Sequence, residues 1–306
     1  MFTLKGKPGL STMGGCMFKG SMVALVTPFK DGKIDEKSLK DLVDFHIKNG
    51  TSALVPCGTT GESATLTYAE HDKVIELTVK FAEGRVPVIA GTGSNSTEEA
   101  ITLTKHAKKA GAKASLQVSP YYNRPTQKGL YLHFKAIAEA ADMPIILYNI
   151  ASRTGVNIEP ETFAKLAGVK NIIGVKEASG SLEQMARIRK ICPKEFLLIS
   201  GDDALTLPVM AIGGTGIISV VANIIPKDVA DMCAAFESGN IEKARELHYR
   251  MLDLVKAMFI ETNPIPVKTA MGLMKLCSPD LRLPMCEMLP ENKDKLVKAM
   301  KEYKLI

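Results

Sequence analysis

A lysine follows directly after one of the apolar runs in this sequence. The run 172–175 is continuous and apolar, and Lys176 comes next. Lysine is uncommon beside a buried strand, and apolar surroundings lower the pKa of its ammonium group from about 10.4, so that the neutral amine can attack a carbonyl carbon. The pattern therefore indicates Schiff-base chemistry. The alternative is a lysine that reaches the rim of the fold and pairs with Glu177.

Two other apolar runs also end in polar residues. The run 144–148 ends in Tyr148, which could donate a proton or be a core aromatic with one polar edge. Arg153 follows it and could bind a carboxylate or pair with a surface acid. The run 53–55 leads into a Gly-Thr-Thr-Gly turn at 58–61, whose glycines permit backbone N–H groups to point at an anion. The same turn could instead have its hydroxyls bonded to its own backbone.

Acidic residues follow the run 196–199 and argue against a phosphorylated substrate. Asp202 and Asp203 would repel phosphate, and such a pair is more typical of a helix N-cap than of a metal site. The five histidines all fall in predicted helices, and none lies at metal-ligand spacing from a cysteine. The sequence therefore predicts no metal site.

The elements that must position these residues alternate regularly between strand and helix. Eight short runs rich in β-branched residues read as parallel strands buried on both faces. They are 23–26, 53–55, 86–90, 114–118, 144–148, 172–175, 196–199 and 216–220. Eight strand–helix repeats in about 200 residues favour a closed (β/α)₈ TIM barrel, whose active site lies at the carboxyl ends of the strands. A doubly wound open sheet is the alternative, but no glycine fingerprint follows the first run.

Helix signals separate the strands and continue alone after residue 224. Ser/Thr-x-x-Glu/Gln patterns beginning at Thr67, Ser96 and Ser181 fit capping boxes. Residues 225–306 read as helices only, over 226–237, 240–260, 264–276 and 291–303. We therefore divide the chain into a flexible extension over 1–16, a catalytic barrel over 17–224 and a C-terminal helical region over 225–306.

Composition places the chain among ordinary globular proteins. Of its 306 residues 46% are hydrophobic and 24% charged, and the net charge of +6 is spread along the whole length, which favours a solvated surface over a nucleic-acid site. No apolar run is long enough to span a membrane. The six cysteines, at 16, 57, 192, 233, 277 and 286, form no C-x-x-C motif and are predicted to be reduced thiols of a cytoplasmic protein. The Gly-Gly-Cys sequence ending at Cys16 lacks the apolar segment of a lipoprotein signal.

Three motifs together resemble those of the pyruvate-dependent class I aldolase and lyase barrels, the N-acetylneuraminate lyase-like family. They are Gly58-Thr59-Thr60-Gly61-Glu62, Tyr148-Asn149-Ile150-Ala151-Ser152-Arg153-Thr154-Gly155 and Gly174-Val175-Lys176-Glu177-Ala178-Ser179-Gly180. The likeness extends from about residue 17 to the end of the chain and includes Ser119-Pro120-Tyr121-Tyr122-Asn123-Arg124-Pro125. Within this group the chain is most similar to the dihydrodipicolinate synthase branch.

The resemblance implies a lyase that condenses pyruvate with L-aspartate 4-semialdehyde in the diaminopimelate route to lysine. Lys176 would form an imine with pyruvate, and the protonated imine is itself the electron sink, so that neither metal nor organic cofactor is implied. Tyr148 would transfer protons through Thr59 and Tyr122. The resemblance also implies four substrate-binding residues: Thr60 for the pyruvate carboxylate, Ile218 and Gly201 beside pyruvate, and Arg153 for the aldehyde's carboxylate.

Two further properties are implied by the resemblance. The residue that matches Tyr122 reaches into a neighbouring subunit, so a homo-oligomer is expected, typically a tetramer built as a dimer of dimers. Inhibition by L-lysine at the dimer interface is also expected. The matching residues are Ser63, Ala64, His71, Asn95, Glu99 and Tyr121, whereas Tyr68 stands where the bacterial relatives usually have a histidine. Glu99 could bind the ammonium group of lysine or simply complete the Ser96 capping box.

Two other functions remain as alternatives at this point. A sugar-acid aldolase or dehydratase would use the same imine, but such relatives as a rule lack an arginine at the position of Arg153. A catalytically silent barrel that senses a ligand would not need Lys176, Tyr148 and Thr59 together.

Overall fold

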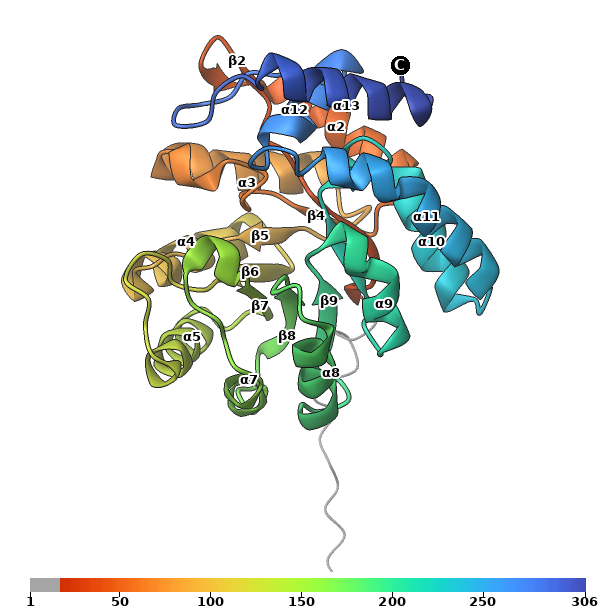
Figure 1. Ribbon diagram of the computed structural model, residues 1–306. Coiled ribbons are helices and arrows are strands. Elements are labelled where there is room, and N and C mark those ends of the chain that lie inside the picture. Colours follow the sequence, from red (N-terminus) through yellow and green to blue (C-terminus); the bar gives the residue numbers. More distant parts are fainter. Residues whose placement is uncertain (1–16) are drawn as a thin grey trace, which may run out of the picture.

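Eight parallel strands form the centre of the computed structural model, which describes residues 17–306 (Figure 1). In chain order they are β1 (Gly20–Ala24), β4 (Ala53–Val55), β5 (Ile89–Gly91), β6 (Ala114–Val118), β7 (Ile145–Asn149), β8 (Ile172–Glu177), β9 (Leu197–Ser200) and β10 (Gly216–Ser219). Their order in the sheet is β4-β1-β10-β9-β8-β7-β6-β5. A bridge between Leu54 and Val88 joins the two ends of this sheet.

This order confirms the predicted barrel and excludes the open sheet. Each strand pairs with its neighbours in the sequence, and β1 pairs with β10, as a closed ring requires. An open doubly wound sheet would reverse its strand order once and leave two unpaired edges. The eight predicted runs all fall on these strands, with ends that differ by up to three residues.

Helices follow the strands and form the outer layer. They are α2 (Glu36–Lys48), α3 (Tyr68–Ala82), α4 (Thr97–Ala110), α5 (Gln127–Ala141), α6 (Ala151–Thr154), α7 (Pro160–Leu166), α8 (Leu182–Ile191), α9 (Thr206–Ala211), α10 (Pro226–Glu237), α11 (Ile241–Ala257), α12 (Ile265–Leu273) and α13 (Pro290–Glu302). Three short 3₁₀ helices, η1 (Ser63–Thr65), η2 (Asp203–Leu205) and η3 (Val221–Asn223), lie in strand-to-helix loops. Pro160 occupies the start of α7, where its lack of an N–H group costs no helical hydrogen bond.

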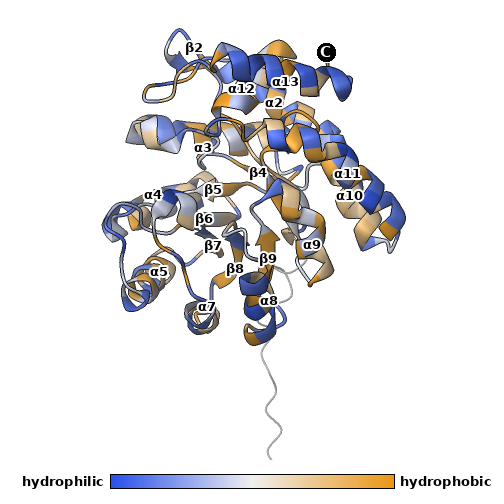
Figure 2. Ribbon diagram, in the orientation of Figure 1, coloured by the Kyte–Doolittle hydropathy of each residue, from blue (hydrophilic) through white to orange (hydrophobic). Residues whose placement is uncertain are grey.

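The hydrophobic residues divide between the inside of the barrel and the layer outside it. Met22, Val55, Ile146 and Ile218 belong to the cluster that fills the interior. A larger cluster joins the outer face of β1 to α2 and to helices α10–α13. In Figure 2 the strands are mostly orange and the outer faces of the helices mostly blue, which agrees with burial of the strands on both sides.

The helices beyond residue 225 cover one side of the barrel. Helix α10 packs against β1, and α11 packs against α10. Helices α12 and α13 share the larger core cluster with α2, beside which they lie in Figure 1. The helical reading of this region is therefore confirmed. The boundary that we set at 224/225 stays a prediction.

Two local features differ from the expectations. An antiparallel hairpin of β2 (Phe29–Lys30) and β3 (Lys33–Ile34) follows β1, and its turn has positive φ at Asp31 and Gly32 (51° and 74°). Asp-Gly favours such a turn, so the signal was present in the sequence. Of the three capping boxes only the one at Thr67 is complete. Ser181 accepts the expected backbone bond, but the side chain of Gln184 binds Asn157 and Glu177 instead.

Some sequence predictions fall on residues that the structure does not describe. The extension over 1–16 and Cys16 lie outside the described residues. The cysteines at 57, 192, 233, 277 and 286 are free thiols, as predicted for them. Within 17–306 no helix is both long and apolar enough to span a membrane.

Candidate active site

Lys176 and Tyr148 lie side by side at the carboxyl ends of neighbouring strands. They are direct register partners, Tyr148 on β7 and Lys176 on β8. Each residue is only 5% exposed, and Nζ of Lys176 lies 4.3 Å from the centre of the Tyr148 ring. The lysine amine therefore points into the barrel mouth and does not reach the rim to pair with Glu177, whose carboxylate instead accepts from Asn149, Ser179 and Gln184.

Burial changes the acid–base properties of Lys176. It lowers the pKa of the ammonium group to about 8, since removal from water disfavours the charged form; the positive charge of Arg153 acts in the same direction and the negative charge of Asp203 opposes it. At pH 7 about one such amine in ten is neutral, against about one in three thousand for an unperturbed lysine. The side chain therefore has the property that a Schiff-base nucleophile needs.

Gly201 provides the space that the lysine side chain occupies. It directly follows β9, and a Cβ atom at this position would lie 3.1 Å from both Cγ and Cε of Lys176 and 2.8 Å from Cβ of Ala178. Contacts of this length require a neighbour to move. The absence of a side chain at Gly201 is therefore part of what positions the amine.

Tyr148 retains its proton at neutral pH. Burial raises the pKa of its phenol to about 12, while the charge of Arg153 and a hydrogen bond with the Thr59 side chain act in the opposite direction. A protonated phenol beside the amine can donate a hydrogen bond and can exchange its proton with the Thr59 hydroxyl. This is the arrangement expected of a group that transfers protons.

The turn after β4 presents two threonines to the same space. Gly61 and Glu62 donate backbone hydrogen bonds to the carbonyl oxygens of Gly58 and Thr59, at 3.1 Å each. The buried Thr60 hydroxyl accepts a hydrogen bond of 3.0 Å from the side-chain amide of Asn263. The two hydroxyls are thus held by Tyr148 and Asn263, and not by the turn's own backbone.

One cavity at the barrel mouth gathers most of the predicted residues. Its lining includes Lys176, Tyr148, Thr59, Thr60, Arg153, Gly201 and Ile218. The same tyrosine, arginine and Thr59 also line a larger adjoining pocket of about 660 Å³. Arg153 lies on α6 at the border of the two and donates a hydrogen bond of 3.2 Å to the backbone oxygen of Asn263. The cavity thus has an inner amine and an outer guanidinium group.

Tyr122 is the predicted catalytic residue that this chain does not bring to the cavity. Tyr122 is 93% exposed, and its backbone φ is 71°. It lines neither of the two pockets. Tyr122 therefore lies outside the cavity that Lys176 lines.

Five of the six residues predicted for lysine binding line the larger pocket: Ser63, Ala64, His71, Glu99 and Tyr121. Asn95 lies beside them and donates to the backbone oxygen of Tyr121 at 3.1 Å. Burial lowers the pKa of His71, whose Nε2 lies 2.8 Å from the carbonyl oxygen of Gly91.

Glu99 does not complete a capping box. Ser96 caps α4, but the Glu99 carboxylate accepts hydrogen bonds from the hydroxyls of Tyr68 and Ser94. The side chain thus faces the pocket and is available to a cation there.

Sequence reasoning missed Asn263, which lines both pockets, and did not predict that Asp203 is buried. No local pattern marks Asn263, which comes from the segment between α11 and α12, and its buried Oδ1 has no hydrogen-bond partner among the described residues. Asp202 is the N-cap that was predicted, whereas Asp203 is buried and accepts from Ser219 at 2.5 Å and from the backbone of Val220 at 3.0 Å. Burial raises the pKa of Asp203 to about 6.

No group of three or more His, Cys, Asp or Glu side chains between residues 17 and 306 is arranged to hold a metal ion. The prediction that no cofactor is used stays a prediction.

Comparison with known proteins identifies the family. The model of the dihydrodipicolinate synthetase family matches residues 17–303. A 4-hydroxy-tetrahydrodipicolinate synthase of Syntrophus aciditrophicus is 59% identical over 290 residues, which cover 95% of this chain and the whole of that protein. The crystal structure of dihydrodipicolinate synthase from Aquifex aeolicus is 52% identical with a TM-score of 0.93, over 94% of this chain and 99% of that one.

A third match is the structure of the enzyme from Cyanidioschyzon merolae with lysine bound. It is 44% identical, with a TM-score of 0.92, and covers 95% of this chain and 99% of that one. These matches confirm the resemblance inferred from the three motifs. The chain belongs to the dihydrodipicolinate synthetase family.

Proposed function

We propose that the protein catalyses the 4-hydroxy-tetrahydrodipicolinate synthase reaction, the condensation of pyruvate with L-aspartate 4-semialdehyde in the diaminopimelate route to lysine. The observation that carries the proposal is the buried Lys176 amine, whose pKa is about 8 and which lies against Tyr148 in a cavity lined by Thr59 and Thr60. Relatives that share this reaction name match almost the whole chain. Because the described cysteines are free thiols, the proposed location is the cytoplasm.

The first half of the reaction takes place at Lys176. Its neutral amine attacks C2 of pyruvate, the carbonyl oxygen leaves as water, and a positively charged imine remains. Loss of a proton from C3 then moves an electron pair into the C2–C3 bond and gives the neutral enamine. Backbone N–H groups and hydroxyls of Thr59 and Thr60 bind the pyruvate carboxylate, and Ile218 and Gly201 contact the rest of the molecule.

The second half joins the aldehyde to the enamine. C3 of the enamine attacks the aldehyde carbon, whose oxygen takes up a proton and becomes a hydroxyl group. The amino group of the aldehyde then attacks the imine carbon, closes the ring and releases Lys176. Arg153 lies on the outer side of the cavity, where its guanidinium group can hold the carboxylate of this second substrate.

Proton transfer in both halves is assigned to Tyr148. Its phenol is protonated at neutral pH because its pKa is about 12, and it is hydrogen-bonded to Thr59. It can therefore donate to the leaving oxygen and be reprotonated through the Thr59 hydroxyl.

We expect reductive trapping to show the imine and its pH dependence. With pyruvate and cyanoborohydride, Lys176 should gain a pyruvate-sized adduct at a rate that rises about tenfold per pH unit and levels off near pH 8, because the neutral fraction of its amine saturates there. Peptide mass spectrometry at a series of pH values measures this rate. Surface lysines in the same sample are the internal control, since their labelling should keep rising to about pH 10.

The Lys176→Met variant should give no adduct in the active-site peptide. The assignment would be contradicted if the labelling rate of Lys176 kept rising with pH as that of the surface lysines does. It would also be contradicted if the adduct formed only on another residue.

The arginine distinguishes the proposed reaction from that of a sugar-acid aldolase. In Arg153→Ala we expect kcat/KM for L-aspartate 4-semialdehyde to fall by about 100-fold or more, because a charge-assisted pair with the carboxylate is lost. The KM for pyruvate should change only a few-fold. Arg153→Lys keeps the charge without the planar guanidinium group and should lie in between. If the parent protein prefers neutral polyhydroxy aldehydes in this steady-state assay, the sugar-acid function is correct.

We also propose that the chain works as a homo-oligomer, a tetramer built as a dimer of dimers, in which Tyr122 completes the site of a neighbouring subunit. The support is the position of this tyrosine, which is 93% exposed on a backbone of positive φ and absent from its own chain's cavity. An exposed tyrosine held in this way can enter a partner's site.

Complementation between two inactive variants tests this arrangement. Co-expressed Tyr122→Phe and Lys176→Met subunits should regain about a quarter of the parent activity, because half of the dimers are mixed and each mixed dimer has one complete site. The separate variants, mixed after purification without subunit exchange, are the control. A monomeric mass in solution, or no regain in mixed oligomers, would refute the arrangement.

Inhibition by L-lysine is the last part of the proposal. The pocket formed with Ser63, Ala64, His71 and Tyr121 has the Glu99 carboxylate directed into it, where it can bind an ammonium group. Asn95 holds the backbone of Tyr121 at the edge of this pocket. A lysine-bound structure of a 44% identical relative supports this assignment. Tyr68 is the difference from the usual pattern, and its hydroxyl already binds Glu99.

We expect Glu99→Gln to raise the inhibition constant for L-lysine by at least about tenfold, because the ammonium group loses its charged partner. Initial rates over a series of lysine concentrations measure the effect. Glu98→Gln is a matched control, since Glu98 lies in the same first turn of α4. A parent enzyme whose rate is unchanged at saturating lysine would exclude the inhibitory site.

A further inference from the structure

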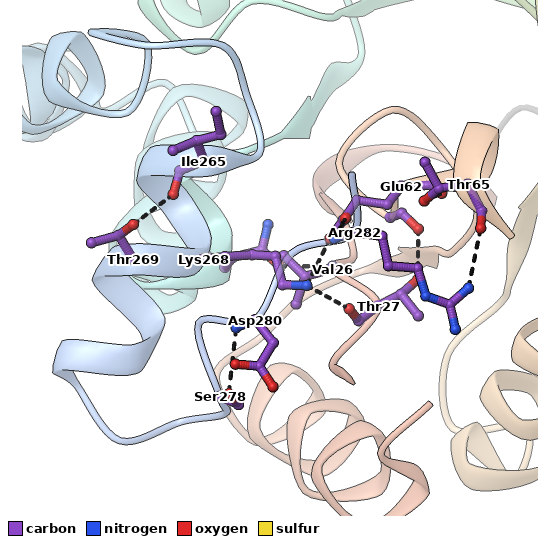
Figure 3. A network of polar contacts seen from close by, with 12 residues as sticks. Val26, Thr27, Glu62, Thr65, Ile265, Lys268, Thr269, Ser278, Asp280 and Arg282 are labelled. Atoms are coloured by element: carbon purple, nitrogen blue, oxygen red, sulfur yellow. Dashed lines mark hydrogen bonds and ion pairs between the residues drawn. The ribbon is translucent and has the colours of Figure 1, made fainter. Parts of the chain in front are cut away.

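An ion pair without access to water lies beneath the threonine turn of the active site. Lys268 on α12 donates a hydrogen bond of 2.6 Å to the carboxylate of Glu62, and the two side chains are 0% and 2% exposed (Figure 3). Glu62 is the last residue of the Gly-Thr-Thr-Gly-Glu motif, and Thr59 and Thr60 precede it by three and two positions. The pair therefore joins the C-terminal helices to the turn that faces the substrate.

Both oxygens of the Glu62 carboxylate have partners. Oε1 accepts from Lys268, and Oε2 accepts from the backbone N–H of Arg282 at 3.1 Å. The backbone of Glu62 has a φ of 52°, the left-handed region that residues with a side chain seldom occupy. The surrounding contacts have to maintain this conformation, because it is unfavourable by itself.

Lys268 also has several partners. Its amine donates to the backbone oxygen of Thr27 at 3.0 Å and lies 4.4 Å from the centre of the Phe29 ring. The Thr27 hydroxyl in turn donates to the backbone oxygen of Gly61 at 2.7 Å. One lysine thus holds the turn at two neighbouring residues, directly at Glu62 and through Thr27 at Gly61.

The remainder of α12 gives no other reason for a lysine at this position. Its neighbours Val267, Ala270 and Met271 are buried apolar residues of the core. A buried ion pair is a poor source of stability, because the desolvation of two charges offsets their attraction and apolar residues of similar volume often do as well. Such a pair instead contributes geometric specificity, since its charge-assisted hydrogen bonds fix the position of each side chain relative to the other.

We propose that Glu62 and Lys268 are positioning residues of the active site, which hold the Thr59–Thr60 turn where it binds the carboxylate of pyruvate. The inference rests on the proposed function. Neither side chain lines the inner cavity with Lys176, so both act through the turn. Asn263, which donates to Thr60 from the segment just before α12, holds the same turn from the cavity side.

The test compares Glu62→Gln, Lys268→Met and the double variant with the parent protein. We expect the KM for pyruvate to rise at least tenfold in each, with a much smaller fall in kcat. The fraction of Lys176 that cyanoborohydride traps at saturating pyruvate should equal that of the parent. The double variant carries no unpaired buried charge, so it can be measured even if Lys268→Met fails to fold.

Met271→Ala is the matched control for lost stability. Met271 is as buried as Lys268 and lies on the same helix, but it belongs to the core cluster and not to the turn. Its melting temperature should fall while its KM for pyruvate stays within twofold of the parent value. If the folded Glu62 and Lys268 variants behave in the same way, the pair is only structural and the inference is wrong.

Trapping of the parent protein with pyruvate distinguishes a failure of this inference from a failure of the proposed function on which it rests. If the parent is not trapped by pyruvate at all, the proposed function itself fails. If it is trapped and the KM values of the variants match that of Met271→Ala, only the positioning role is overturned.

Discussion

The exclusion of water from the amine of Lys176 is the constraint on which the rest of the site depends. An ammonium group inside a closed barrel loses its hydration, and this loss lowers its pKa to about 8. Asp203 limits the effect, because its negative charge favours the charged form and is itself held by Ser219 and Val220. The balance gives an amine that is neutral often enough to attack a carbonyl and can still carry charge as an imine.

The geometry of the barrel determines which groups share this water-excluded site. Parallel strands in register place Tyr148 directly beside Lys176, and the neighbouring strand end has a glycine where a side chain would displace the lysine stem. The same burial therefore acts on the amine and on the phenol, in opposite directions. It lowers the pKa of the amine and raises that of the phenol, so that a partly neutral amine and a protonated phenol coexist at neutral pH.

The sequence was informative where position along a strand determines position in space. Lys176, Tyr148 and Thr59 could be selected because each lies at the end of an apolar run or just after it, and in a barrel the carboxyl ends of all strands meet at one face. Asn263 and Lys268 could not be selected, because the bonds that they donate to Thr60 and Glu62 span 203 and 206 residues of sequence. No local pattern encodes such a contact. Glu99 shows a related limit. The Ser-x-x-Glu spacing from Ser96 is compatible both with a capping box and with a carboxylate that faces the pocket, and only the structure distinguishes the two.

The long-range contacts have a common physical reason. A strand is held by the hydrogen bonds of its neighbours, but the turn that follows it has left the sheet and needs other partners. The turn after β4 obtains them from beyond residue 260: an amide from Asn263, an ammonium group from Lys268 and a backbone N–H from Arg282. The C-terminal helices are thus part of what fixes the active-site loop, although the sequence presents them as a separate region. Without these three contacts the turn would keep only its own backbone hydrogen bonds and those from the barrel, such as the bond from Thr27 to Gly61.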